Sequence, residues 1–347
     1  MVPNLRFLKF NQNYETLQLK NTLKIKSGKD QKQVEVENGI YNIYGTGGII
    51  GHTNTFLYDK ESVGIGRKGT IDKPVYFDQP FWTVDTLFYS EIYEGFIPKY
   101  IFYLFQTINW KKYNTSTGVP SLTSSSIENI EKSFPCYDEQ LKVANFLTMI
   151  DMRIETQIKI IDSYFSLSKA ISNTLIGQSK GNTRLRECLN CYSSNTMESV
   201  IKQEDLGDYP VYGANGIIKK INNYEIEYPS IAIVKDGSGV GKIFKLSGKY
   251  SILSTLNYLT SKPGYDIDYI YYALKQKSLK KYVVGSGIPH IYFKDYEQEK
   301  IYIPQNELQQ HNITSVLQSI DEEIGNEIKQ LKNYELLKKY LLKNMFV

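Results

Sequence analysis

The sequence repeats itself with a period close to half its length. Tyr44–Gly45 and Gly48–Ile50 return as Tyr212–Gly213 and Gly216–Ile218, 168 residues later. Three more matches follow in the same order at shifts of 168 to 170: Ser62–Gly69 with Ser230–Gly237, Thr117–Pro120 with Ser286–Pro289, and Ile150–Asp151 with Ile320–Asp321. A shift that is nearly constant over such a distance predicts two related copies in one chain. Each copy is long enough to carry a core of its own.

Composition limits the class of protein without identifying it. The 347 residues are 41% hydrophobic and 22% charged, which is typical of a globular protein with room for two domains. No apolar run approaches the ~20 residues that span a bilayer, and Val2–Arg6 does not resemble a secretion signal. Three cysteines are too few for a disulfide framework. We therefore expect a cytoplasmic protein. Its net charge of +4 is compatible with a polyanionic partner but does not indicate one.

Each copy begins with an irregular front segment, at about 14–136 and 183–305. Gly, Pro, Asn and Ser interrupt these segments every few residues, and the runs between them are rich in Val, Ile, Tyr and Phe. We expect one helix in each front segment, over Pro98–Trp110 and Asp268–Lys280. The front segments are thus predicted to be mixed α/β domains, with strands that include Val75–Phe77, Thr83–Tyr89, Ile231–Val234 and Lys300–Ile303.

Each copy ends in a long helical segment. Between Glu139 and Ile176 there is no Pro or Gly, and apolar residues recur at helical spacing. We expect Asp138 and Asn306 to cap the two helices. A stripe on so long a helix cannot be covered by one small domain, so the two helices are predicted to pack together as an antiparallel coiled coil. The stripes are Ile150, Ile154, Ile158, Ile161, Tyr164, Phe165, Leu167, Ile171 and Leu175 in the first copy, and Ile320, Ile324, Ile328, Leu331, Tyr334 and Leu337 in the second.

Two glycine-rich segments imitate nucleotide-binding motifs. Gly64–Gly69 fits G-x-G-x-x-G, but Thr70–Pro74 follows it where a helix is required, and the second copy keeps only the last glycine, as Gly237. Gly237–Lys242 resembles a P-loop, but Asp236 replaces the first glycine and Ile243 replaces the Ser or Thr that would bind magnesium. Both segments are interpreted as tight turns between strands, and no cofactor site is predicted in this chain.

Cysteine, histidine and carboxylate chemistry is equally incomplete. Pro135–Cys136 resembles the nucleophile dipeptide of cytosine methyltransferases, but its counterpart is Pro304–Gln305. Cys188 and Cys191 form a lone C-x-x-C without a second pair of ligands, so no metal site is predicted. We find no catalytic residues, and the sequence favours a protein that recognises a ligand while a partner carries out the reaction.

Several ordered motifs together resemble one known family, the specificity subunits of type I restriction-modification systems. They are the opening Val2–Phe7, the Tyr-Gly-x-x-Gly-Ile-Ile motif in each half, Thr117–Leu122, and Pro135–Gln140 before the first long helix. The second copy opens with Asn182–Leu185 and lacks the aromatic residue expected there. The resemblance covers the whole chain and implies two target recognition domains, in pseudo-twofold arrangement, that are joined and separated by the two long helices. It predicts recognition domains at 1–137 and 179–305, and spacer helices at 138–178 and 306–347.

The resemblance also implies the partners. These are double-stranded DNA, two methyltransferase subunits, and restriction subunits in the full complex. S-adenosylmethionine and ATP are expected on the partner subunits, and the methylated base is expected to be adenine. Each recognition domain would read one half of a split DNA target.

Loops that recur in both copies are the candidate DNA contacts. Bases are recognised by short polar side chains, Arg and Lys, whereas phosphates are bound by Lys, Arg, hydroxyls and backbone N–H groups. Side chains that differ between the copies are favoured as base-reading groups because two half-sites usually differ. The glycines of these loops are also explained by a repeated hairpin fold. The candidates are Tyr44, Thr46, Gly47, Arg67, Lys68, Thr115, Thr117 and Ser121 in the first copy, and Tyr212, Ala214, Asn215, Lys235, Asp236, Ser286 and His290 in the second.

Charged residues also lie on the outer faces of the long helices. We interpret them as solvated, with contact to the DNA spacer or to a methyltransferase as the alternative. They are Lys142, Arg153, Lys159, Lys329, Lys332 and Lys338. The sequence as a whole favours a DNA-recognition subunit without catalytic activity. The alternatives are a stand-alone DNA-binding or scaffolding protein built from the same duplicated domains, and an enzyme whose site has no recognisable motif.

Overall fold

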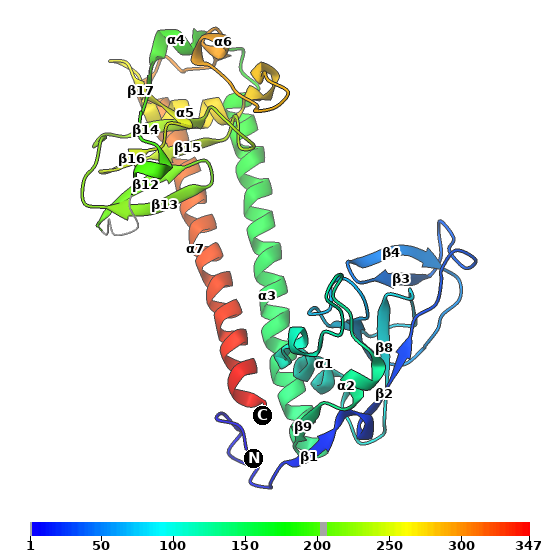
Figure 1. Cartoon of the computed structure of the whole chain (residues 1–347). Helices are drawn as coiled ribbons and strands as arrows, with labels where there is room; N and C mark the ends of the chain where they lie inside the picture. The colour runs from blue at the N-terminus through cyan, green and yellow to red at the C-terminus, as the bar shows by residue number, and fades with distance from the viewer. Residues whose placement is uncertain (1, 202–206) are drawn as a thin grey trace. The chain divides into compact units, whose positions relative to one another are not determined.

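The computed structural model describes residues 2–201 and 207–347. The chain forms two units, one made of Met1–Lys159 with Lys329–Val347 and the other of Ile160–Ile328. In Figure 1 the strands of the first unit are coloured from blue to blue-green, and those of the second unit from green through yellow to orange. The boundary falls inside both long helices, so each unit contains part of each helix.

The first unit contains two antiparallel sheets and a third that includes one parallel pair. The four-stranded sheet has the order β2-β8-β5-β6, the three-stranded sheet the order β4-β3-β7, and β1 pairs with β9. Among the strands that the structure describes in this unit, only β3 and β7 run parallel to each other. The strands are β1 (Glu15–Gln18), β2 (Leu23–Ser27), β3 (Tyr41–Gly45), β4 (Gly48–Thr53), β5 (Ser62–Gly66), β6 (Val75–Phe77), β7 (Phe81–Thr83), β8 (Leu87–Ile92) and β9 (Glu131–Phe134).

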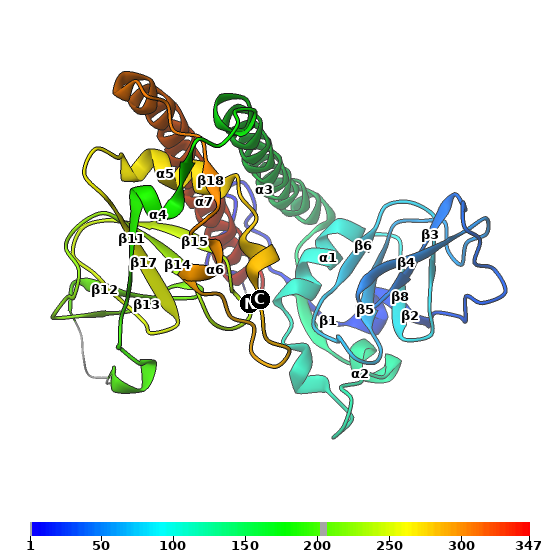
Figure 2. The same cartoon turned by 90° about the horizontal axis from the view of Figure 1, so that it is seen from above.

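The second unit repeats this topology. Its four-stranded sheet has the order β11-β17-β14-β15 (Figure 2). The three-stranded sheet has the order β13-β12-β16, and β10 pairs with β18. The β10–β18 pair corresponds to β1–β9 and places the start of the second repeat no later than Thr183. The strands are β10 (Thr183–Arg184), β11 (Leu189–Ser193), β12 (Tyr209–Gly213), β13 (Gly216–Ile221), β14 (Ser230–Val234), β15 (Ile243–Leu246), β16 (Ser251–Ile252), β17 (Leu256–Ser261) and β18 (Lys300–Ile301).

The predicted strand Thr83–Tyr89 is wrong as a single element. β7 ends at Thr83 and β8 begins at Leu87, with a turn between them that is closed by the Leu87 N–H donating to the Val84 carbonyl at 3.0 Å. The two strands belong to different sheets, so the chain has to change direction here. The predicted strands Val75–Phe77 and Ile231–Val234 are confirmed, whereas β18 is shorter than Lys300–Ile303.

Each front segment contains more than the one predicted helix. The main helices are α1 (Pro98–Thr107) and α5 (Ile267–Lys275), each shorter than expected because a 3-10 helix follows it. Each bears a tyrosine that anchors it to a long helix. Tyr103 donates to Asp151 at 2.8 Å and Tyr272 donates to Asp321 at 2.9 Å. The remaining short helices are α2 (Ser124–Glu128), α4 (Leu185–Cys188), α6 (Phe293–Tyr296) and the 3-10 helices Leu19–Asn21, Trp110–Tyr113, Glu198–Val200 and Leu279–Tyr282.

The two long helices are α3 (Tyr137–Ser172) and α7 (Glu307–Met345). A π-helical turn, Asn173–Gly177, ends the first. The Asn306 side chain caps α7 by accepting from the Leu308 N–H at 2.9 Å, as predicted. The predicted cap Asp138 lies inside the first turn of α3 instead, where its negative charge favours the helix N-terminus.

Within the first unit, the two helices run antiparallel. Asp151 forms an ion pair with Lys338 at 2.7 Å, and six residues farther along α3 Gln157 accepts from Gln330 Nε2 at 3.3 Å. The contacts on α7 thus shift toward its N-terminus as those on α3 shift toward its C-terminus. The ion pair also corrects the interpretation of Lys338 as merely solvated. Leu341, Met345 and Phe346 of the C-terminal segment complete the core of this unit around Val143 and Leu147.

The apolar stripes are only partly buried. Ile150, Ile161 and Ile324 are buried, and Ile154 packs against the first core. Ile158 is 43% exposed and Ile328, its counterpart, is 47% exposed. The predicted continuous seam is therefore interrupted at equivalent places in the two copies.

The opening Val2–Phe7 segment is fixed to the start of α3. The Arg6 guanidinium binds both oxygens of the fully buried Glu139 carboxylate, at 2.8 and 2.7 Å, and Tyr14 donates to the same carboxylate at 3.0 Å. Because a buried charge is costly unless it is paired, the buried Glu139 explains the presence of Arg6 in this segment. Phe7 packs edge-on against Phe146.

Candidate nucleic-acid interface

The candidate interface of the first unit is built around the turn that follows β5. Gly69 has a φ of +92°, a conformation that strongly favours glycine, and its counterpart Gly237 has a φ of +90°. The prediction of a tight turn at these glycines is confirmed. The turn brings Arg67 and Lys68 to the surface in the first unit, and Lys235 and Asp236 to the same place in the second.

A hairpin loop pairs with this turn in both units. In the first, Gly69 N–H donates to the Pro120 carbonyl and Leu122 N–H to the Arg67 carbonyl, at 2.8 and 2.9 Å. In the second, Gly237 N–H donates to Pro289 and Ile291 N–H to Lys235, both at 2.9 Å. Lys68 therefore lies opposite Ser121, and Asp236 lies opposite His290. These four predicted residues are brought together in matching pairs.

The loop closure is also repeated. Thr115 N–H donates to the Ser121 carbonyl at 2.9 Å, and Val284 and His290 exchange backbone hydrogen bonds at 2.8 and 2.9 Å. Thr117 and Ser286 lie inside these closed loops and are exposed. An exposed hydroxyl at a loop tip can donate to or accept from a ligand without losing an internal partner.

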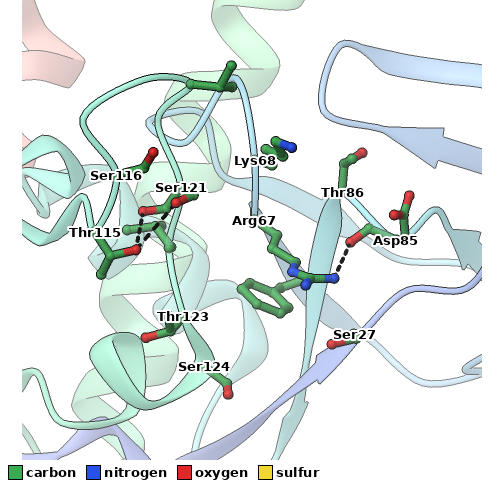
Figure 3. Close-up of a pocket in the computed structure, with 13 residues that line it drawn as sticks. Ser27, Arg67, Lys68, Asp85, Thr86, Thr115, Ser116, Ser121, Thr123 and Ser124 are labelled. Atoms are coloured by element: carbon green, nitrogen blue, oxygen red, sulfur yellow. Dashed lines mark hydrogen bonds between the residues drawn. The ribbon is translucent and has the colours of Figure 1, made fainter.

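A polar pocket of about 700 Å³ opens between the turn and the hairpin of the first unit. Figure 3 shows Arg67 in its centre, with Thr115, Ser121 and Thr123 on one side and Ser27, Asp85 and Thr86 on the other. The Arg67 guanidinium donates to the Asp85 carbonyl at 3.2 Å and lies 6.0 Å from the centre of the Phe88 ring. Four predicted residues line this pocket: Arg67, Lys68, Thr115 and Ser121.

The pocket also contains residues that the sequence prediction missed. Ser27, Asp85, Thr86 and Phe88 come from β2, β8 and the turn before β8, and tertiary pairing alone brings them to Arg67. Of these residues, the repeat could have indicated Thr86, whose counterpart is Thr255. The Thr86 carbonyl accepts from Arg67 N–H, and the Thr255 carbonyl accepts from Lys235 N–H. Ser116, Thr123 and Ser124 line the pocket as well, and they extend the hydroxyl-rich side of it.

The strand residues below the turn differ between the two units. β11 pairs with β17 as β2 pairs with β8, so Ser193 and Asn257 stand where the first unit has Ser27 and Phe88. Ser193 donates to the Asn257 side chain at 2.7 Å. An amide in the second unit therefore stands where the first unit has the aromatic ring that lies near Arg67.

The β3–β4 and β12–β13 turns lie beside the same loops. A side chain at Gly69 would come within 3.9 Å of Thr46 Oγ1, and one at Gly239 would come within 3.5 Å of Ala214 Cβ. Asn215 accepts from Lys242 Nζ at 3.2 Å. Gly47 is exposed at the tip of its turn. The predicted turn residues thus lie near the predicted loops in each unit.

The two predicted tyrosines have mainly structural contacts. The Tyr44 ring packs against Phe77 with 4.9 Å between ring centres, and its hydroxyl accepts from Asn42 Nδ2 at 3.2 Å. The Tyr212 ring packs edge-on against Tyr250, and burial raises the pKa of Tyr212. Both are half-buried, so only part of each ring is accessible to a ligand.

The segments that imitate nucleotide-binding motifs lie in a strand or in a turn that leads into one. Gly64–Gly66 lies in β5, and Gly237–Lys242 is a turn that runs directly into β15. A phosphate bound by either motif would require a helix N-terminus at that point. The backbone geometry therefore does not match the motif.

Cys188 and Cys191 are also in structural positions. Burial raises the pKa of Cys188 to about 12 and that of Cys191 to about 11, which disfavours the reactive thiolate. Among residues 2–201 and 207–347, no group of three or more His, Cys, Asp or Glu side chains is arranged to hold a metal. Over the same residues, no helix combines the length and apolar character needed to cross a membrane.

Comparison with known proteins agrees with the duplication. The sequence profile of the family described as "Type I restriction modification DNA specificity domain" matches twice, at residues 11–162 and 183–333. The chain is 34% identical over 169 residues to the type I restriction enzyme MjaVIII specificity subunit of Methanocaldococcus jannaschii, a match that covers 45% of this chain and 39% of that subunit. It is 22% identical over 120 residues to the EcoprrI specificity subunit of Escherichia coli, with coverage of 35% and 30%. The chain thus matches less than half the length of each of these relatives.

Solved structures share the fold over the whole chain. The S subunit of a type I restriction-modification system from M. genitalium superposes with a TM-score of 0.74 at 19% identity, covering 100% of this chain and 99% of that one. A chain from a structure that describes complex assembly of the type I R-M system superposes with a TM-score of 0.52 at 11% identity, covering 96% and 97%. At these identities the likeness concerns the fold alone. The profile, however, matches most of the chain in two copies, and the protein therefore belongs to the family of type I restriction-modification DNA specificity domains.

Proposed function

We propose that this chain is the DNA sequence-recognition subunit of a type I restriction-modification complex. Each of its two units reads one half of a split target. The chain has no catalytic activity of its own and docks the methyltransferase subunits that modify the DNA. Membership of the family favours this function over a stand-alone DNA-binding or scaffolding protein.

The observation that carries the proposal is the repeated turn-and-hairpin unit. The backbone hydrogen bonds that join the turn to the hairpin are the same in both units, whereas the side chains displayed there differ. Lys68 and Ser121 in one unit correspond to Asp236 and His290 in the other. Two domains that bind the same kind of ligand but recognise different base sequences need a shared backbone structure that carries different polar side chains.

Cationic residues shared by the two units support contact with the DNA backbone. Arg67 corresponds to Lys235, and a lysine pair precedes each hairpin, Lys111–Lys112 in the first unit and Lys280–Lys281 in the second. Lys111 is paired with Asp72 and Lys281 with Glu299. Phosphates are identical in every sequence, so residues of the same charge at equivalent positions are suited to bind them.

Exposed apolar side chains on the long helices support docking of two methyltransferase subunits. Ile158 and Leu337 are exposed in the first unit, and their counterparts Ile328 and Leu167 are exposed in the second. A pair of matched apolar surfaces suits two copies of one partner. We propose that restriction subunits join the same complex, and that S-adenosylmethionine and ATP are bound by the partners.

The proposal is tested by mapping methylated adenines in the genome of the native host. Substitution of Thr46–Gly47 or Ser121 is expected to alter one half of the methylated sequence, and substitution of Ala214–Asn215 or His290 the other half. Each variant is compared with Lys60→Asp, an exposed change at the opposite end of β5. If every loop variant changed both halves equally, independent reading by the two units would be refuted.

A second test compares the chain alone with the reconstituted complex. A net charge of +4 provides little surplus to neutralise phosphates. The isolated chain is therefore expected to bind target and scrambled duplexes weakly at physiological salt, and the complex with methyltransferase subunits to bind the target tightly. Nanomolar, target-specific binding by the isolated chain would instead favour the stand-alone alternative.

A further inference from the structure

Residues 68 and 236 occupy one backbone position of the repeat and carry opposite charges. Each follows the strand that ends at Gly66 or Val234, each N–H points to a threonine carbonyl, at 3.3 Å for Thr86 and 3.4 Å for Thr255, and each lies opposite the last residue of the hairpin. The main chain thus presents both side chains in the same way. A difference in what the two units bind at this point has to come from the side chains.

Neither charge is neutralised inside the protein. The Lys68 ammonium and the Asp236 carboxylate form no hydrogen bond or ion pair with any residue in the part of the chain that the structure describes. Lys68 is exposed, and Asp236 is half-buried beside Lys235. An unpaired carboxylate at a predicted DNA interface is informative because the phosphates repel it. A favourable contact then requires a hydrogen-bond donor on the DNA.

The bases offer such donors in the major groove. Cytosine presents its N4 amino group there, and Asp or Glu accepts from it, whereas guanine presents the O6 and N7 acceptors that suit Lys or Arg. We propose that Lys68 and Asp236 are specificity-determining residues, and that Lys68 selects a guanine in one half-site while Asp236 selects a cytosine at the corresponding step of the other. This assignment rests on the proposed function and adds the base chemistry to it.

The residues beside Lys68 and Asp236 are consistent with the assignment of guanine to one and cytosine to the other. Ser121, opposite Lys68, carries a hydroxyl that suits any base edge, and the Thr115 hydroxyl lies 3.3 Å from it. His290, opposite Asp236, directs its Nδ1 toward the Ile288 carbonyl at 3.2 Å. Neither neighbour supplies an opposite charge that would cancel the preference set by residue 68 or 236.

The experiment selects bound duplexes from a library of random sequence with the complex of this chain and its methyltransferase subunits. The wild type is expected to select a split sequence with guanine in one half and cytosine in the other at these steps. Asp236→Asn is expected to change the selected cytosine to adenine, because an amide pairs with adenine N6 and N7. Asp236→Lys is expected to change it to guanine, and Lys68→Asp to change the guanine of the other half to cytosine. Each change is expected to alter base preference about 10- to 100-fold at one position.

The matched controls reverse the same charges outside the turn. Lys60→Asp and Glu227→Lys lie at exposed positions before β5 and β14, at the far ends of the strands that lead to Lys68 and Asp236. They are expected to leave the selected sequence unchanged. Thermal unfolding of each variant, and its binding to the methyltransferase subunits, establish that it is folded and assembled.

The outcomes separate the two proposals. If the wild type selects a split sequence and the folded Lys68 and Asp236 variants select that same sequence, the base assignment is wrong and the proposed function stands. The same holds if these variants change affinity equally for all sequences, since that would place both residues at phosphates. If the wild-type complex selects no split sequence, the proposed function fails and the base assignment fails with it.

Discussion

The Asp151 carboxylate on α3 forms an ion pair with the Lys338 ammonium on α7, with 2.7 Å between Oδ1 and Nζ. The other oxygen, Oδ2, accepts from the Tyr103 hydroxyl at 2.8 Å. The counterpart Asp321 accepts from Tyr272 in the same way, but Ser168 stands where the lysine would be. Asp151 therefore has an ion pair, whereas Asp321 has none with any residue in 2–201 and 207–347.

This difference predicts unequal effects of one substitution. Asp151→Asn and Asp321→Asn both keep the shape of the side chain, but only the first removes an ion pair. Asp151→Asn is expected to lower the free energy of unfolding by about 0.5–1 kcal/mol more than Asp321→Asn, because the pair is partly exposed. The measurement is urea unfolding of both variants at low and high salt. Equal losses, or a difference that salt does not reduce, would contradict an electrostatic contribution.

Burial along the helices predicts which isoleucines tolerate a charge. Ile324 is buried and Ile154 packs against the first core, so Ile154→Asp with Ile324→Asp is expected to destroy folding or assembly, at a cost of several kcal/mol. The control is Ile158→Asp with Ile328→Asp, which changes two exposed members of the same stripes. Circular dichroism melting is expected to separate the two double variants clearly. A soluble Ile154/Ile324 variant with unchanged melting would refute the packing described here.

Buried tyrosines predict loss of stability in alkali. Burial raises the pKa of Tyr250 to about 12, and it raises the pKa values of Tyr103, Tyr269 and Tyr272 as well. Above about pH 10 the unfolded chain loses these protons before the folded chain does, so the unfolded state binds fewer protons and stability falls as pH rises. The stabilisation is complete below about pH 10 and is lost as the pH passes through the raised values.

The measurement for this prediction is tyrosinate absorbance followed together with circular dichroism. The buried tyrosines are expected to titrate in one step that coincides with unfolding. Gradual titration of all tyrosines near pH 10 with the fold intact would contradict their burial.

The lysine pairs before the two hairpins predict a change in salt dependence. Lys111→Gln with Lys112→Gln, or Lys280→Gln with Lys281→Gln, is expected to weaken binding of the complex equally to target and scrambled duplexes. The slope of log K against log salt is expected to fall by about 0.9 for each phosphate that the variant no longer neutralises. Lys20→Gln with Lys24→Gln, on an exposed part of the first unit, serves as the control. A weakening confined to the target sequence would place these lysines at bases instead.

The duplication made much of this architecture predictable. The repeat predicts the two related units. The long helices, the turns at Gly69 and Gly237 and the cap Asn306 follow from residues that are local in the sequence. The split between β7 and β8 was not predictable in this way, because it depends on which sheet each strand joins. The ion pair of Lys338 was missed for the same reason, since its partner lies 187 positions away in the chain. The floor of the pocket formed by Ser27, Asp85 and Phe88 likewise exists only after strand pairing.

The core of the first unit has a consequence for biosynthesis. That unit needs Leu341, Met345 and Phe346, whereas the second unit is one continuous stretch, Ile160–Ile328. A ribosome delivers residues in order, so every residue of the second unit has been made before the first unit receives its last side chains. Domains usually fold in the order in which they are synthesised. Here the order is reversed. The first unit cannot complete its core until the end of α7 has been translated.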